Sequence, residues 1–205
     1  MTTTPQGTLP VGGGRDVLDL LTDDHRELEE LFAELEGGEG TPQQRRDLAD
    51  VVIAELVRHA IAEEEYVYPT ARRALADGDE VADHEIAEHG EAEQLMKDLE
   101  GVDPTDPRFD TLLTELTATI RQHVADEEAN LFPRLRATCP AAELTDLAGK
   151  VEAAKRLAPT RPHPAAPDTP PWNKLLAPGT GLIDKVRDAL SGRPTKESDL
   201  GGTPR

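Results

Sequence analysis

Six side chains that suit metal binding occur as three pairs, each separated by the same 64-residue shift. The pairs are His25 with His89, His59 with His123, and Glu63 with Glu127. Residues four apart on a helix lie on one face, one turn above the other. Each His-x-x-x-Glu pair therefore presents an imidazole and a carboxylate to the same point. The shift also aligns Tyr68-Pro69 with Phe132-Pro133, so a whole helical hairpin is repeated.

These six residues lie on the apolar stripes of their expected helices, where an unpartnered carboxylate is costly to bury. A lone histidine on such a stripe is usually a hydrogen-bonded core residue, but that explains poorly four histidines and two glutamates related by one shift. A metal ion removes the cost of burial. The sequence therefore predicts a metal site made of His25, His59, Glu63, His89, His123 and Glu127.

The number and type of ligands indicate which metal is expected. Four imidazoles and two carboxylates exceed one tetrahedral zinc, and they lack the oxygen-only character that calcium and magnesium prefer. Shared between two ions, with Glu63 and Glu127 bridging, the set gives each ion two nitrogens and two oxygens. Mixed imidazole and carboxylate ligation suits iron.

Two competing metal motifs fail on spacing. Ferritin-like sites use Glu-x-x-His, and no histidine of this chain has a glutamate three residues before it. The stretch from His84 to His89 resembles a zinc-protease box, but one extra residue moves the two imidazoles off a common face.

Composition favours a soluble helical protein. Aromatic residues make up 3% of the 205 residues, too few for a typical sheet sandwich. The formal net charge of -19 opposes binding to a nucleic-acid backbone. We expect neither a secretory signal nor a membrane-spanning helix, and the single Cys139 is compatible with a reducing cytoplasm.

The six residues must be positioned by helices joined by short loops. Apolar spacing predicts helices over about 15–36, 43–77 and 79–100, and a fourth after the cap Asp106, with Thr41 capping the second and Pro69 kinking it. Short connections imply an all-α, up-down-up-down four-helix bundle. We expect a flexible arm over 1–14, a bundle with a short fifth helix over 15–157, and a Pro-rich tail over 158–205. Within the tail, 181–190 is an amphipathic segment that docks on the bundle or on a protein partner.

The ordered combination of motifs over about residues 15–136 resembles the hemerythrin-like proteins of the HHE cation-binding group. The residues that carry the resemblance are Asp24-His25, His59-x-x-x-Glu63-Glu64, Tyr68-Pro69, Glu88-His89, His123-x-x-x-Glu127-Glu128 and Phe132-Pro133. The resemblance implies a four-helix bundle that holds two iron ions, bridged by an oxo or hydroxo group, in a non-haem diiron centre. It also implies handling of dioxygen, nitric oxide or peroxide, or sensing of oxygen or iron.

Two departures from the oxygen-carrying members bear on the reaction. Those proteins place two histidines one turn apart on the third helix, whereas here His84 stands five residues before His89. They also carry an aspartate five residues after the last histidine, where this chain has Glu127 at four. Fewer nitrogen ligands favour reaction with peroxide over reversible oxygen carriage, and His84 is expected outside the ligand set. Tyr66, three residues after Glu63, is expected to pack or hydrogen-bond near the site, or to ligate iron.

The sequence thus predicts a cytoplasmic diiron protein that reacts with peroxide or a related small oxidant, in a catalase-like or protective role. The alternative is a module that binds dioxygen, nitric oxide or iron without turnover and reports it to a partner through the tail. A zinc-storing or purely structural bundle is the third reading. No membrane or nucleic-acid partner is expected, and the sequence leaves the oligomeric state open.

Overall fold

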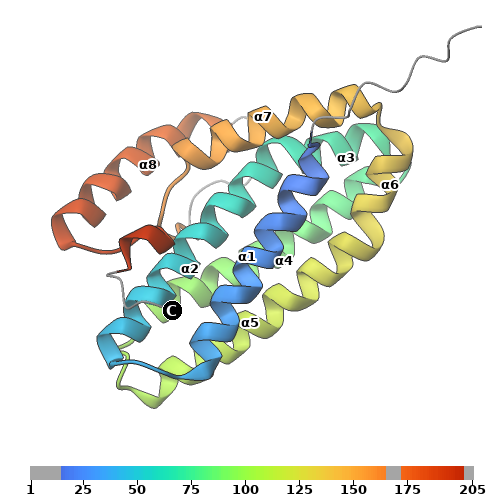
Figure 1. Ribbon diagram of the computed structural model, residues 1–205. Helices are drawn as coiled ribbons and strands as arrows, with labels where there is room; N and C mark the ends of the chain where they lie inside the picture. Colours follow the sequence, from blue (N-terminus) through green and yellow to red (C-terminus); the bar gives the residue numbers. More distant parts are fainter. Residues whose placement is uncertain (1–14, 165–171, 201–205) are drawn as a thin grey trace, which may run out of the picture.

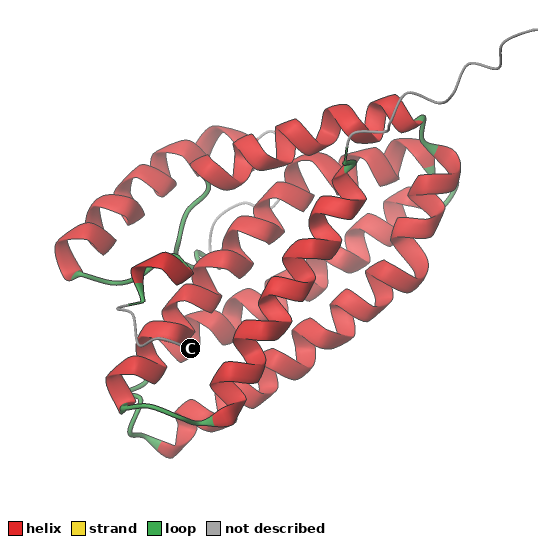
Figure 2. Cartoon of the chain, viewed as in Figure 1, coloured by secondary structure: helices red, strands yellow, loops and turns green. Residues whose placement is uncertain are grey.

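The chain forms a bundle of antiparallel helices in a computed structural model, which describes residues 15–164 and 172–200, with backbone alone for 172–179. The long bundle helices are α1 (Val17–Gly37), α2 (Pro42–Ala62), α4 (Gly78–Glu100) and α5 (Pro107–Asp126). They lie side by side, with α1 packed on α2 and α4 on α5 (Figure 1). Within the described residues every regular element is a helix (Figure 2). This confirms the predicted all-α helical bundle. The predicted arm over 1–14 lies outside the described residues.

Local sequence signals start the helices. The Asp16 and Thr41 side chains accept hydrogen bonds from the first-turn amides of α1 and α2, and Asp106 does the same for α5. Proline occupies the first helical position of α2 and α5, where its missing N–H costs nothing. A Cβ at Gly78 would collide with the backbone oxygen of Ala71, so the turn into α4 requires glycine. The predicted caps Thr41 and Asp106 are confirmed.

Both repeats contain a π-helical turn directly before the proline. Helix α2 passes through η1 (Glu63–Val67) into α3 (Tyr68–Ala74), and α5 passes through η2 (Glu127–Leu131) into α6 (Phe132–Thr138). The amide of Tyr68 donates to the carbonyl of Glu63, five residues earlier, and Phe132 donates to Glu127 in the same way. A wider turn accommodates a proline that cannot continue the ordinary hydrogen-bond ladder. At the kink expected from Pro69, the helix instead has a π turn, which contains one more residue than an ordinary turn. The extra residue changes the side of the helix on which each later residue lies.

Two apolar clusters lie on either side of the six predicted ligands. One contains Leu28, Phe32, Val52 and Leu99 and fills the bundle near the α1–α2 connection. The other contains Leu18, Leu21, Leu135 and Val151 and fills the opposite end. Helix α7 (Ala141–Leu157) contributes to the second cluster and packs along α1 and α2. The polar centre is thus enclosed between two packed hydrophobic layers.

The C-terminal segment returns across the bundle through α8 (Trp172–Ser191) and the short turn η3 (Glu197–Asp199). Helix α8 turns its acidic side inward, because Asp184 pairs with His163 and Asp188 with Arg161. Among the described side chains of α8, four large apolar ones are more than half exposed to solvent: Leu182, Ile183, Val186 and Leu190. The amphipathic segment predicted over 181–190 therefore contacts the bundle through its charged face. None of the helices in the described residues has the length and apolarity that crossing a membrane requires.

Candidate metal centre

The six predicted ligands come together from four helices in the middle of the bundle. Glu63 divides its carboxylate between two histidines, with Oε1 3.2 Å from Nε2 of His59 and Oε2 3.5 Å from Nε2 of His89. Glu127 places Oε2 3.5 Å from Nε2 of His25 and 3.7 Å from Nε2 of His123. Both glutamates are fully buried. Each carboxylate thus reaches histidines of both repeats.

The histidines form two pairs with nearly the same geometry. Nε2 of His25 lies 3.1 Å from Nε2 of His59, and Nε2 of His89 lies 3.1 Å from Nε2 of His123. Two ligands about 2.1 Å from one ion and at right angles to each other are separated by roughly 3.0 Å. The spacing of each pair therefore fits two nitrogens bound to one cation.

In each of the four histidines of the centre, Nδ1 contacts a carboxylate from another helix. Nδ1 of His25 lies 2.9 Å from Glu128, and Nδ1 of His89 lies 3.0 Å from Glu64. In the other two histidines, Nδ1 of His59 faces Asp24 at 3.3 Å and Nδ1 of His123 faces Glu88 at 2.9 Å. A carboxylate on Nδ1 holds the proton there and leaves the Nε2 lone pair free for a metal. In each pair the two Nε2 atoms then face each other, as two ligands of one cation do.

Four carboxylates outside the predicted ligand set contact its histidines, and the 64-residue repeat relates them in two pairs. Asp24 and Glu88 occupy equivalent repeat positions, as do Glu64 and Glu128, and each pair serves equivalent histidines. Glu64 and Glu128 form their hydrogen bonds with the rings of His89 and His25. Sequence reasoning did not single out Glu85, which is 1% exposed and has Oε2 3.2 Å from Nδ1 of His123. The repeat places Leu21 at the equivalent position, so symmetry could not reveal it.

Tyr68 supplies the hydroxyl of the site. Its O–H group lies 3.2 Å from Oε1 of Glu127, to which it donates, and 3.0 Å from Nε2 of His89. The side chain is fully buried. Burial and the charge of Glu127 raise the pKa of Tyr68 well above its usual value, so the hydroxyl keeps its proton. The π turn accounts for this position, because five residues in the wider turn bring Tyr68 over Glu63.

Tyr66 packs against an apolar cluster, and His84 lies at the surface. Tyr66 is half-buried against the apolar cluster at the α3 end. A regular α-helix would direct Tyr66 toward the ligands, but the π turn over Glu63–Val67 changes the direction of its side chain. His84 has a side chain 59% exposed and pairs with Glu88 of its own helix at 3.4 Å.

Burial of so many titratable groups distorts their proton affinities. Burial and the neighbouring Glu63 raise the pKa of Glu127 to about 8. Burial opposes charge on His59, but Glu63 and Asp24 outweigh it and raise the pKa of that imidazole to about 10. Burial and the proximity of His59 lower the pKa of His25 to about 4. Burial opposes charge on His89, the repeat equivalent of His25, but Glu63 and Glu64 outweigh it and raise its pKa, so equivalent residues differ in proton affinity.

The donor set passes a direct test of fit for a cation. Both oxygens of Glu63, Oε2 of Glu127 and Oε2 of Glu85 are buried without a hydrogen-bond partner in the described residues. Such orphaned carboxylate oxygens are costly unless a cation compensates them. Ligand atoms within 4.8 Å of one another form overlapping groups, which are His25–His59–Glu63–Glu127, Glu63–His89–His123 and Glu85–His123–Glu127. The cluster therefore offers candidate positions for a metal ion, and Glu63, His123 and Glu127 each belong to two of these groups.

Two cavities adjoin the centre. One of about 20 Å³ lies against His59, His89 and His123 and is otherwise lined mostly by apolar side chains such as Met96 and Ile120. A second of about 80 Å³ reaches His59 and Asp24 from the side covered by α7, past Lys155. The first volume suits a molecule about the size of water. Only small ligands fit beside the histidines without movement of the bundle.

Comparison with known proteins assigns the family. The model of the hemerythrin HHE cation binding domain matches residues 16–135, so the chain belongs to the hemerythrin HHE cation-binding family. This confirms the resemblance seen in the sequence. An uncharacterized hemerythrin-like protein of Schizosaccharomyces pombe is 27% identical over 179 residues, covering 87% of this chain and 88% of that protein.

Two further proteins are more distant in sequence or length. A DNA nickase of Nostoc is 28% identical over 140 residues, covering 68% of this chain but 39% of the nickase. The crystal structure of a hemerythrin HHE cation binding domain-containing protein from Mycobacterium kansasii has a TM-score of 0.60 at 20% identity. The alignment covers 69% of this chain and 85% of that one. The structural similarity supports the fold alone.

Proposed function

We propose that the cluster holds two iron ions and that the loaded protein decomposes peroxide or reduces a related small oxidant. The observation that carries the proposal is the sharing of Glu63 and Glu127 between two histidine pairs whose spacing suits one cation each. His25 and His59 would hold one ion and His89 and His123 the other. Imidazole with carboxylate suits iron better than calcium, magnesium or a single structural zinc.

When bound, the two ions would supply the redox equivalents for the net conversion of two peroxide molecules into two waters and one dioxygen. The chain's own contribution is positioning. Glu64, Glu88, Glu128 and Asp24 orient the imidazoles through Nδ1. The two apolar clusters exclude bulk water, and the small cavity limits entry to molecules of the size of peroxide or dioxygen.

Tyr68 supports reaction with an oxidant over simple carriage of one. Its hydroxyl retains its proton and projects from one repeat into the other, between His89 and Glu127. A buried donor at this point can hydrogen-bond to an oxygen atom of a bound oxidant and assist proton movement. The equivalent Phe132 has no such group.

One set of measurements tests this function. The protein is loaded anaerobically with ferrous iron, its iron content is determined, and optical spectra and oxygen release are recorded before and after peroxide addition. We expect two irons per chain, a spectral change on oxidation and catalytic oxygen release. Stoichiometric zinc in the purified protein, with no uptake of iron, would contradict the diiron assignment.

The alternative is a binding module that senses dioxygen, nitric oxide or iron. The contact between Lys155 and Asp24, together with the crossing of the C-terminal segment, gives the site a route to the tail. If iron-loaded protein releases no oxygen from peroxide, while nitric oxide or dioxygen changes the protease sensitivity of residues 158–205, the sensor replaces the enzyme.

DNA nicking is not carried over from the Nostoc relative. A net charge of -19 repels a phosphate backbone, and the match covers only 39% of that protein. We propose a cytoplasmic location, because the one cysteine gives no internal disulfide.

A further inference from the structure

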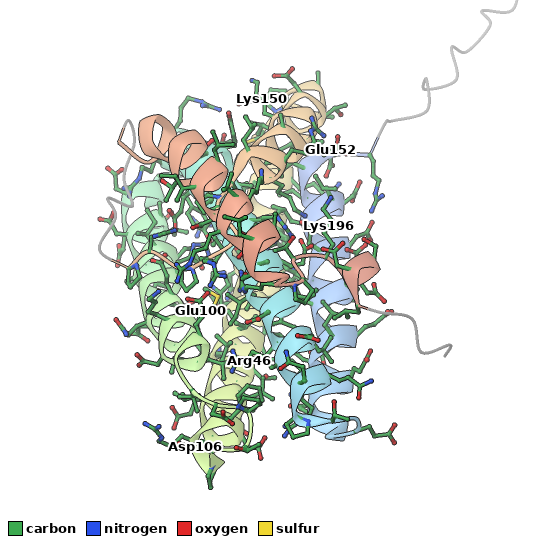
Figure 3. All side chains as sticks on the ribbon, turned by 90° about the vertical axis from the view of Figure 1, so that its left-hand side faces the viewer. Arg46, Glu100, Asp106, Lys150, Glu152 and Lys196 are labelled. Atoms are coloured by element: carbon green, nitrogen blue, oxygen red, sulfur yellow. The ribbon has the colours of Figure 1, made fainter. Side chains whose placement is uncertain are left out.

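A cationic cleft lies where the C-terminal segment crosses α2 and α7, outside the metal centre. Its volume is about 380 Å³. Five basic side chains line it and come from three helices and the segment before η3: Arg58, Lys155, Arg156, Lys185 and Lys196. Glu55 is the one carboxylate among its lining residues. Figure 3 shows Lys196 on the C-terminal segment, apart from Lys150 in the middle of α7.

Much of this positive charge is not neutralised by the described residues. Arg58 pairs with Glu55 at 2.7 Å, and Lys155 pairs with Asp24 at 2.6 Å. Within residues 15–164 and 180–200, no carboxylate forms a salt bridge with the other three lining cations, which are Arg156, Lys185 and Lys196. Burial, Arg58 and Lys196 lower the pKa of Lys185, which is the expected effect of neighbouring positive charges.

A cluster of basic side chains is not expected from the overall composition of this chain. The chain has 41 acidic and 22 basic residues, so most of its surface repels anions. Three cations without a salt bridge to a described carboxylate, beside the paired Arg58 and Lys155, then create a local field that attracts anions. Arginine forms paired hydrogen bonds with phosphate oxygens, and lysine acts as a point charge toward them. The volume lies at the lower end of the range for small-molecule sites.

We propose that this cleft binds the phosphate group of a small soluble molecule. The bundle contributes Arg58, Lys155 and Arg156, and the C-terminal segment contributes Lys185 and Lys196. A bound anion neutralises both sets and holds the segment against the bundle, since a ligand stabilises the state that binds it. Arg58 already ties the two parts together by donating to the backbone oxygen of Thr195 at 2.8 Å.

The site also adjoins the passage toward the metal centre. Glu55 and Lys155 line both the cationic cleft and the 80 Å³ cavity that reaches His59. Glu197, next to Lys196, lines that same cavity. Phosphate binding therefore favours the position of the segment in which Glu197 lies beside the passage. This role is independent of the metal identity and of peroxide turnover.

Calorimetric titration of the full chain with inorganic pyrophosphate at fixed ionic strength tests the proposal. We expect one saturable site per chain. Arg156→Gln and Lys196→Gln each remove an exposed cation and should weaken binding by about tenfold. Lys150→Gln is the matched control, because Lys150 is an exposed lysine of α7 that pairs with Asp146 outside the cleft. Its affinity should equal that of the unchanged protein.

Three outcomes would overturn the proposal. The first is no saturable binding, and the second is equal weakening in Lys150→Gln, which indicates diffuse attraction. The third is binding to phosphatidylglycerol vesicles that depends on Lys196 while pyrophosphate fails to bind. That result assigns the cations and the exposed apolar side of α8 to a lipid surface.

Amide hydrogen exchange tests where on the protein pyrophosphate binds. Pyrophosphate should slow amide exchange over residues 193–199, where Thr195 and Lys196 donate to Asp199, and the effect should be lost in Lys196→Gln. Protection confined to other parts of the chain would put the anion elsewhere and reject the cleft.

Discussion

The two halves of the metal centre are nearly equivalent, and one difference between them is the hydroxyl of Tyr68, which Phe132 lacks. In the first repeat Tyr68 lies against His89 of the second, with ring centroids 5.3 Å apart. In the second repeat Phe132 stacks on His25 of the first, at 5.7 Å. The ligands, their carboxylate partners and both π turns follow the repeat. The repeat therefore duplicates the candidate ligands, and the unmatched hydroxyl distinguishes one half from the other.

The environments of the two halves differ in a second way. Asp24, which supports His59, is itself paired with Lys155 from α7. Glu88, which supports His123, is accompanied by Glu85 at 3.2 Å from the same nitrogen. One half is thus backed by a cation from an added helix and the other by a second carboxylate. Equivalent ligands of the two halves therefore need not have equal affinities for a metal ion.

The largest effect is expected from removing a shared ligand. Glu63→Ala should abolish binding of both irons, because its two oxygens face histidines of both halves. Iron content after ferrous loading measures this, with Glu91→Ala on the exposed side of α4 as the control. Retention of one iron would show that the halves bind independently and that Glu63 does not bridge.

The next largest effect concerns the unmatched hydroxyl. Tyr68→Phe makes the two halves alike and should lower peroxide decomposition by about a hundredfold while both irons are retained. The double variant Tyr68→Phe with Phe132→Tyr moves the hydroxyl to the other half and should recover part of the rate. Unchanged oxygen release in Tyr68→Phe would limit the tyrosine to packing.

Carboxylates that orient histidines should have a smaller effect on metal affinity. Asp24→Asn should weaken iron binding by about 10- to 100-fold. Glu88→Gln should cost less, because Glu85 remains beside Nδ1 of His123. Competition with a chromophoric chelator gives both affinities, and the order of the two variants tests the difference between the halves. A greater loss in Glu88→Gln would reject the compensating role of Glu85.

Proton release gives a finer measure of the same centre. At pH 7 the metal-free protein should hold protons on Glu127, whose pKa is about 8, and on His59, whose pKa is about 10. Metal binding must displace both, so apparent affinity rises with pH and at least these two protons appear in solution. Calorimetry in buffers of different ionisation enthalpy counts them. Release of none would show that Glu127 and His59 are already deprotonated at pH 7.

The smallest expected effect is on stability. Lys155→Met removes the 2.6 Å contact with Asp24, whose side chain is 11% exposed. We expect a loss of about 1 kcal/mol, partly offset by solvent, and a Tm lower by about 2–4 °C. Lys150→Met, which removes an exposed pair with Asp146, should leave the Tm unchanged. Equal shifts in both variants would assign the effect to α7 in general.

The amino-acid sequence alone determined the helical class and the set of six candidate ligands. Periodicity of 3.6 residues marks buried faces, and a 64-residue repeat selects His89 over His84 without any coordinates. The periodicity is a local property of each segment, and the repeat requires only an alignment of the chain with itself, so neither needs the tertiary structure. The sequence also identified the caps Thr41 and Asp106, since capping depends on a few adjacent residues.

Only the tertiary structure decided which tyrosine enters the site. Straight-helix geometry favoured Tyr66, whereas the π turn before Pro69 rotates Tyr68 inward, and a one-residue change of helical phase cannot be read from apolar spacing. Glu85 and Lys155 likewise gain their roles from helices that meet in space. The same holds for α8, whose acidic side faces the bundle because Arg161 and His163 lie there and pair with it. Contacts between distant segments set these outcomes, and the sequence order of the partners gives no sign of them.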